Sequence, residues 1–62
     1  MFSIELLKQM RMFVGYSQQD MATATNYSRS YISKIEQGTV ETSLIVQLHI
    51  LQACRRAGME DW

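Results

Sequence analysis

One stretch of the sequence places hydrogen-bonding side chains at helical spacing with no acid among them. Ile32 and Ile35 fall on one side of a helix over residues 29–37, and polar residues recur one turn apart on the opposite side. That polar stripe consists of Arg29, Ser30, Ser33, Lys34 and Gln37. Long donors and short hydroxyls are the groups that reach base edges and phosphates in a DNA major groove. The stripe therefore favours a contact with nucleic acid over the plainer interpretation, a solvated helix face.

The rest of the sequence lacks a pattern typical of an active site. His49 is the single histidine, and it lies mid-helix between Leu48 and Ile50. No pair of carboxylates is spaced for acid–base work. Cys54 has no second cysteine for a disulfide or a zinc site, which suits a reducing cytoplasm and a small core residue. We therefore expect a protein that is not an enzyme and that uses neither a metal nor a cofactor.

Length and charge limit the possibilities further. A chain of 62 residues forms one domain, 1–62, and buries only about 60% of its unfolded surface, so a partner subunit would help its stability. Six basic residues balance six acidic ones, so any DNA contact depends on where the charges lie.

Glu5, Lys8 and Arg11 interrupt the apolar N-terminus, and no stretch fits a secretory signal or a membrane span. We expect a cytoplasmic protein without membrane contact, associated with the nucleoid when bound to DNA.

Serines and glycines mark the expected helix ends. Ser3 is placed to cap a first helix that runs to Val14, with Gly15 just past its end. A second helix opens with Ser17-Gln18-Gln19-Asp20, a variant of the capping box, and is interrupted by Asn26-Tyr27-Ser28. These signals predict two short helices joined by a tight turn, the geometry of a helix-turn-helix, over about residues 17–37.

The second half of the chain continues the helical pattern. The third helix runs from Arg29 to about Gln37 and stops at Gly38. A loop over residues 39–42 leads to Ser43, which is placed to cap a fourth helix from Leu44 to about Ala57. No segment alternates with a period of two for long enough to predict a sheet. The fold class is therefore all-α, a compact bundle of four or five short helices.

Over about residues 6–54 the sequence resembles the phage repressor and Cro type of helix-turn-helix, also called XRE-like. The resemblance rests on Leu7-x-x-Met10-Arg11, Gly15-Tyr16-Ser17-Gln18, Met21-Ala22, the run from Tyr27 through Glu36 to Gly38, and Ser43-Leu44 with Leu48. It implies a lambda-repressor-like DNA-binding domain. Asn26 stands where the family usually has glycine, and Thr42 where proline is common. The 39–42 loop also lacks the basic residues that many members place on phosphates, which lowers the expected affinity.

The resemblance also implies roles for individual residues. The positions that match base-reading residues are Arg29, Ser30, Ser33 and Lys34. The positions that match phosphate contacts are Ser17, Gln18, Tyr31, Gln37 and Thr39. Gln18 would in addition brace the recognition helix, and Arg11 and Glu36 match a buried ion pair between the first and third helices.

The predicted fourth helix is apolar nearly all round. We expect one stripe to cover the core, namely Leu44, Leu48, Leu51 and Cys54. The second apolar stripe is too large for so small a chain to bury, so it predicts a partner. The predicted dimer or partner interface comprises Ile45, Val46, His49, Ile50, Ala53 and Trp62.

Three functions fit these observations. The favoured hypothesis is a sequence-specific transcriptional regulator, a repressor that binds double-stranded DNA at a palindromic operator as a homodimer. The first alternative is an antitoxin that binds DNA and also holds a toxin through its fourth helix or tail. The second is a protein-interaction module that has kept the fold and lost DNA binding, which the zero net charge allows.

Overall fold

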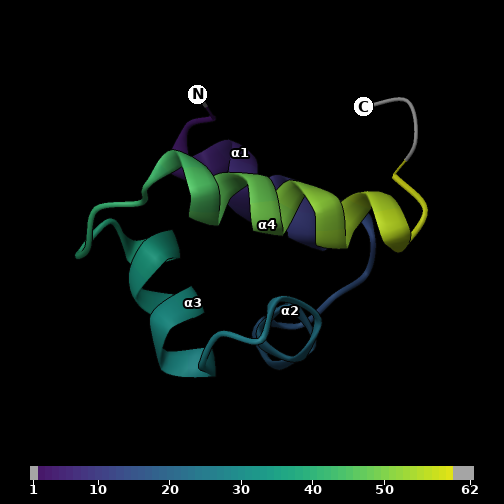
Figure 1. Cartoon of the computed structure of the whole chain (residues 1–62), viewed down its shortest axis with the longest axis horizontal. Helices are drawn as coiled ribbons and strands as arrows, with labels where there is room; N and C mark the ends of the chain where they lie inside the picture. The colour runs from purple at the N-terminus through teal and green to yellow at the C-terminus, as the bar shows by residue number, and fades with distance from the viewer. Residues whose placement is uncertain (1, 60–62) are drawn as a thin grey trace.

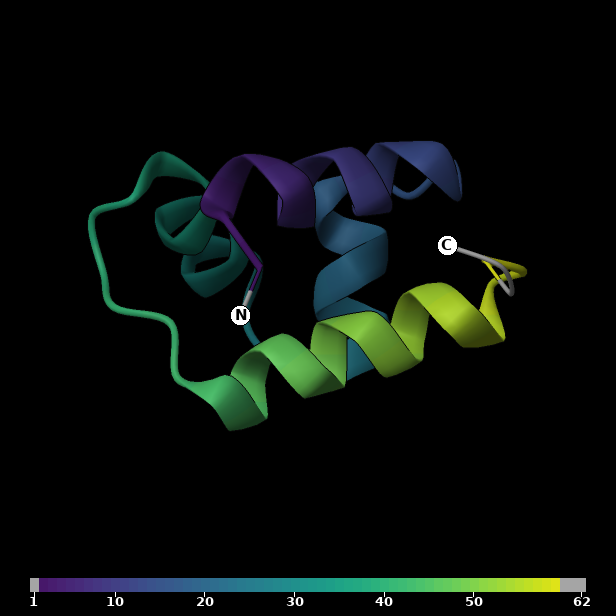
Figure 2. The same ribbon diagram turned by 90° about the horizontal axis from the view of Figure 1, so that it is seen from above.

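The computed structural model describes residues 2–59, and within that range the protein is built from helices and turns without strands. Its four helices are α1 (Ile4–Phe13), α2 (Gln18–Thr25), α3 (Arg29–Gln37) and α4 (Leu44–Arg56). Figure 1 shows α4 lying across α2 and α3, and Figure 2 shows α2 running between α1 and α4. The prediction of an all-α bundle that contains a helix-turn-helix is confirmed.

Every helix begins after a serine cap. The serine side-chain oxygen accepts a hydrogen bond from a backbone N–H of the first turn, which would otherwise lack a partner. These bonds join Ser3 to Leu6 and Ser17 to Asp20 at 3.0 Å, Ser28 to Tyr31 at 3.0 Å, and Ser43 to Val46 at 3.4 Å. In α2 the bond is reciprocated, because the Asp20 carboxylate accepts from the Ser17 backbone N–H at 2.9 Å.

A residue in the left-handed backbone conformation lies at the end of each of the first three helices. Gly15 follows α1 with φ of 78°, and the N–H of the next residue, Tyr16, donates to the Arg11 carbonyl. Gly38 closes α3 in the same way with φ of 76°. Asn26 ends α2 with φ of 64°, a conformation that asparagine tolerates better than most residues. The turn between α2 and α3 is therefore tight, as helix-turn-helix geometry requires.

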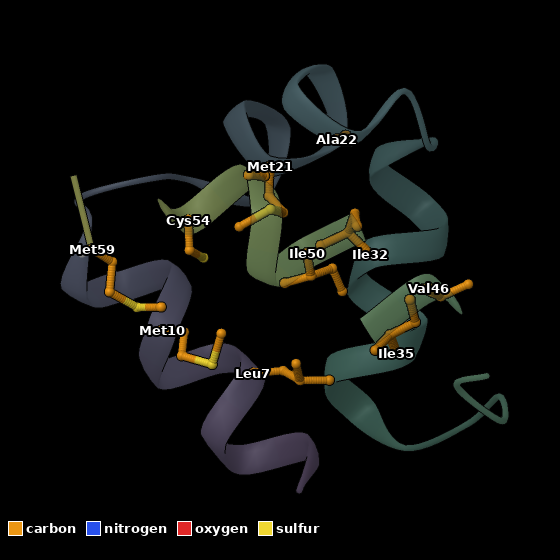
Figure 3. Close-up of a cluster of buried hydrophobic side chains, with 11 residues drawn as sticks. Leu7, Met10, Met21, Ala22, Ile32, Ile35, Val46, Ile50, Cys54 and Met59 are labelled. Atoms are coloured by element: carbon orange, nitrogen blue, oxygen red, sulfur yellow. The ribbon is translucent and has the colours of Figure 1, made fainter. Parts of the chain in front are cut away.

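The core lies where the four helices meet. Figure 3 shows apolar side chains from every helix converging there. The largest fully buried side chains belong to Met10, Met21, Ile32, Ile35, Cys54 and Met59. Methionine fits the irregular spaces between short helices because its side chain is unbranched and flexible.

The sequence-based assignment of the two faces of α4 is wrong for most of its residues. Val46, Ile50 and Ala53, which were expected at a partner interface, are 7%, 4% and 1% exposed and form part of the core. Leu44 and Leu48, which were expected in the core, are instead exposed.

This orientation of α4 also buries the polar residue Gln47. Its Oε1 accepts from the Phe2 backbone N–H at 3.0 Å, and its Nε2 donates to the Thr42 carbonyl at 3.2 Å. Both ends of the amide are therefore satisfied in this orientation, whereas an unpaired buried amide would be costly. Of the other expected interface residues, Ile45 is exposed and His49 is half-buried, while Trp62 lies outside the described residues.

Within residues 2–59, none of the helices is long and apolar enough to cross a membrane. The same residues contain no group of three or more histidine, cysteine, aspartate or glutamate side chains arranged to hold a metal ion.

Candidate nucleic-acid interface

The outward face of α3 presents the polar stripe as one surface. Arg29, Ser30, Lys34 and Gln37 are exposed and Ser33 is half-buried, whereas the opposite face of the helix is inserted in the core. Gln18, the first residue of α2, lies beside the stripe. Together these side chains line a shallow depression of about 420 Å³, formed by Gln18, Arg29, Ser30, Ser33, Lys34 and Gln37. The fold therefore joins the N-terminus of α2 to the exposed face of α3.

The first turn of α3 is exposed because of the way the helix begins. Asn26 in the left-handed conformation turns the chain, and Ser28 caps the helix immediately before Arg29. Arg29 and Ser30 therefore occupy an exposed helix N-terminus, where the partial positive charge of the helix favours anionic groups. This end of α3 is suited to approach the phosphates and bases of a nucleic acid.

Two residues of the stripe are linked to each other. The side-chain amide of Gln37 donates to Ser33 Oγ at 3.2 Å. The bond leaves the Gln37 carbonyl oxygen free to accept and the Ser33 hydroxyl proton free to donate. The middle of the stripe thus offers both kinds of hydrogen-bonding group in a partly fixed arrangement.

Glu36 ties α3 to both preceding helices. Arg11 of α1 binds the Glu36 carboxylate through Nε at 2.7 Å and through Nη2 at 3.1 Å, with side chains only 11% and 8% exposed. The Gln18 amide donates to the same carboxylate at 3.1 Å. Arg11 and Glu36 thus form the pair that the resemblance implies, and Gln18 braces α3 through Glu36.

Arg11 also holds the connection between α1 and α2. Its Nη1 donates to the backbone carbonyl of Tyr16 at 2.7 Å. A single guanidinium therefore fixes the end of α1, the turn that leads into α2, and α3. This network sets the position of Gln18 relative to the polar stripe, so the interface is prearranged by buried contacts.

Of the other expected phosphate contacts, Ser17 and Thr39 already make structural hydrogen bonds, and Tyr31 packs against Tyr27. Ser17 caps α2, and the Thr39 hydroxyl donates to the Lys34 carbonyl at 3.2 Å, close to the end of α3. Tyr31 is half-buried, with its ring edge-on to that of Tyr27 at 5.3 Å between centroids.

Two hydrogen bonds hold the pKa of Asp20 below its usual range, first that from the Ser17 backbone N–H and then that involving the Ser17 side chain. Asp20 is therefore ionised at neutral pH beside the N-terminus of α2.

The structure also shows a contact that the sequence did not suggest. The Tyr27 hydroxyl lies 2.7 Å from His49 Nδ1, and the two rings are 5.8 Å apart between centroids. The contact joins the turn before α3 to the middle of α4. His49 thereby has a structural role, and no spacing in the sequence reveals a pairing over 22 residues.

Comparison with known proteins gives one match. A family model described as a helix-turn-helix domain matches residues 5–61. No curated protein and no solved structure matches the chain. The family match spans nearly the whole chain and agrees with the capped α2, the tight turn and the exposed α3. The protein belongs to the helix-turn-helix domain family.

Proposed function

We propose that this protein is a sequence-specific DNA-binding regulator that inserts α3 into the major groove. The observation that carries the proposal is the acid-free polar face of α3, continuous with Gln18 at the N-terminus of α2. In helix-turn-helix proteins the second helix of the motif enters the groove and its N-terminal residues contact base edges. Arg29 and Ser30 occupy that position in α3.

Base reading is assigned first to Arg29. It is exposed in the first turn of α3, and arginine paired with guanine O6 and N7 is the commonest specific contact in the major groove. Ser30 and Ser33 offer short hydroxyls beside it, and Lys34 lies one turn further along. Gln18 and Gln37 line the same depression, and Thr39 follows the end of α3; all three are proposed to contact phosphates.

The proposed regulator acts as a homodimer on a palindromic operator. One subunit offers only Arg29 and Lys34 as cations on the polar face, and affinity for DNA rises with the number of neutralised phosphates. Two subunits double that number and read two half-sites about one helical turn apart. We further propose repression as the outcome, because a bound dimer excludes other proteins from the DNA it covers.

Selection from a random pool of duplex oligonucleotides tests this proposal. We expect the bound sequences to share a palindrome with a guanine in each half-site. Arg29→Ala should lose the preference for that guanine, worth about 1–3 kcal/mol, while keeping its helical content. Lys8→Ala removes the same charge from the exposed side of α1 and serves as the matched control. If Arg29→Ala lowers affinity equally for all sequences, Arg29 contacts phosphate and does not read a base.

The zero net charge favours a second candidate, a protein-interaction module that does not bind DNA. Fluorescence polarisation with random-sequence duplex at low salt separates the two, because a DNA-binding domain retains nonspecific affinity under those conditions. An antitoxin would bind DNA in this assay and would also form a stable complex with a toxin. The exposed apolar part of α4 is compatible with that arrangement.

A further inference from the structure

A hydrogen bond ties the turn before α3 to the middle of α4. The Tyr27 hydroxyl lies 2.7 Å from His49 Nδ1, and the two rings are 5.8 Å apart between centroids. Within residues 2–59 it is the one side-chain hydrogen bond that joins this turn or α3 to α4. Both side chains are half-buried, so the bond lies at the margin of the core and can be removed without opening a cavity among the fully buried residues.

The Tyr27 ring extends this restraint to the first turn of α3. It lies edge-on to the Tyr31 ring, with 5.3 Å between centroids and 63° between the ring planes. Tyr27 immediately precedes the cap residue Ser28, and Arg29 is the first residue of the helix. The contacts that start at His49 therefore end in the helical turn that carries Arg29.

The two ends of α3 are held by different contacts. Glu36, near the C-terminal end, accepts hydrogen bonds from Arg11 and Gln18. Arg29 lies seven residues earlier, which is about 10 Å along a helix that rises about 1.5 Å per residue. A small tilt of α3 about the end that Glu36 fixes therefore displaces Arg29 more than any other residue of the helix. The Tyr27–His49 bond restrains the end where such a tilt has the largest effect.

We propose that Tyr27 and His49 are positioning residues for DNA recognition and that they act through Arg29. This inference rests on the proposed function. A bidentate contact of arginine with guanine needs two hydrogen bonds, which weaken steeply when their angles change. Attraction to phosphate is Coulombic and tolerates the same displacement. The Tyr27–His49 bond therefore supports discrimination between sequences more than it supports affinity for DNA in general.

Removing one hydroxyl group tests this role. Tyr27→Phe should weaken binding to the operator selected from the random pool by about 2- to 10-fold for each bound copy of α3, the range that one hydrogen bond supplies. Its affinity for a duplex of scrambled sequence should change by less than about 2-fold in fluorescence polarisation, because phosphate contacts dominate that binding. Tyr16→Phe removes the same group from another half-buried tyrosine and should change neither affinity. If Tyr27→Phe weakens binding to both duplexes equally, the proposal is wrong.

Two variants of His49 separate positioning from stability. Asparagine presents an oxygen and an N–H₂ group where histidine has Nδ1, so it can bond the Tyr27 hydroxyl in either direction, whereas leucine cannot. Leucine has the higher helix propensity, so His49→Leu should be at least as stable as His49→Asn in urea denaturation. We nevertheless expect His49→Asn to bind the operator nearly as tightly as the wild type, and His49→Leu to bind it as weakly as Tyr27→Phe. If operator affinity instead follows the order of stability, His49 only stabilises the fold and the proposal is overturned.

A double-mutant cycle tests whether the effect passes through Arg29. In the Arg29→Ala background, Tyr27→Phe should have little further effect on operator affinity, because the side chain that it positions is absent. Full additivity of the two losses would overturn the proposal and leave DNA binding intact. A wild type that prefers the operator, with no loss in Tyr27→Phe or His49→Leu, also overturns this inference alone. A wild type that binds neither duplex overturns the proposed function, and this inference with it.

Discussion

Replacing Arg11 by methionine should destabilise the protein severely. The guanidinium is nearly buried and makes two hydrogen bonds to Glu36 and one to the Tyr16 carbonyl. Arg11→Met leaves the Glu36 carboxylate buried with the Gln18 amide as its remaining donor, at 3.1 Å. Removing one partner of a buried ion pair costs about 3–5 kcal/mol.

That loss is large for a protein of this size. A 62-residue domain has about 3–9 kcal/mol of total stability, and 1 kcal/mol shifts its Tm by about 4–8 °C. We therefore expect Arg11→Met to lower the Tm by at least about 12 °C and to leave part of the protein unfolded at 25 °C. The measurement is urea denaturation followed by circular dichroism, which gives the free energy of unfolding.

Two further variants identify the cause of the loss. Lys8→Met changes an exposed residue of the same helix, and its free energy of unfolding should lie within about 0.5 kcal/mol of the wild-type value. Adding Glu36→Gln to Arg11→Met should recover on the order of 1–3 kcal/mol, because it removes the buried charge that has lost its partner. If the free energy of unfolding of Arg11→Met lies within about 1 kcal/mol of the wild-type value, the pair is not buried as described.

Three other predictions concern charge, pH and packing. Each neutralised phosphate makes the slope of log affinity against log salt concentration more negative by about 0.9. Two copies each of Arg29 and Lys34 in a dimer should therefore give a slope of roughly −3 to −5. A slope near zero, measured by fluorescence polarisation, would rule out phosphate contacts. NMR titration of Asp20 should show a pKa below the ordinary value of about 3.9. The contribution of Asp20 to stability is then fully present at a pH above that ordinary pKa, and it is lost as the pH falls through the lower folded-state pKa. Ser17→Ala should raise the pKa of Asp20, because it removes the hydrogen bond of the Ser17 side chain. Ile50→Glu should unfold the chain and not merely separate a dimer, because Ile50 is 4% exposed in the core; a helical variant with cooperative unfolding would contradict this.

The sequence determined the elements of this protein closely. The serine caps Ser3, Ser17, Ser28 and Ser43 satisfy backbone donors within one turn, so the beginnings of the helices depend on local chemistry. The glycine and asparagine stops act within a few residues as well. The polar face of α3 could also be predicted, because a helix with two buried isoleucines on one side must expose the other.

Only the tertiary structure decided which face of α4 is buried. Its apolar residues surround the helix, so periodicity alone could not choose between the two stripes. The choice depends on how α4 packs on α1 and α2, and one of the distant contacts made there joins Gln47 to Phe2 across 45 residues. Glu36 meets Arg11 across 25 residues for the same reason: local spacing specifies helices, whereas the partners of buried polar groups depend on how the helices pack.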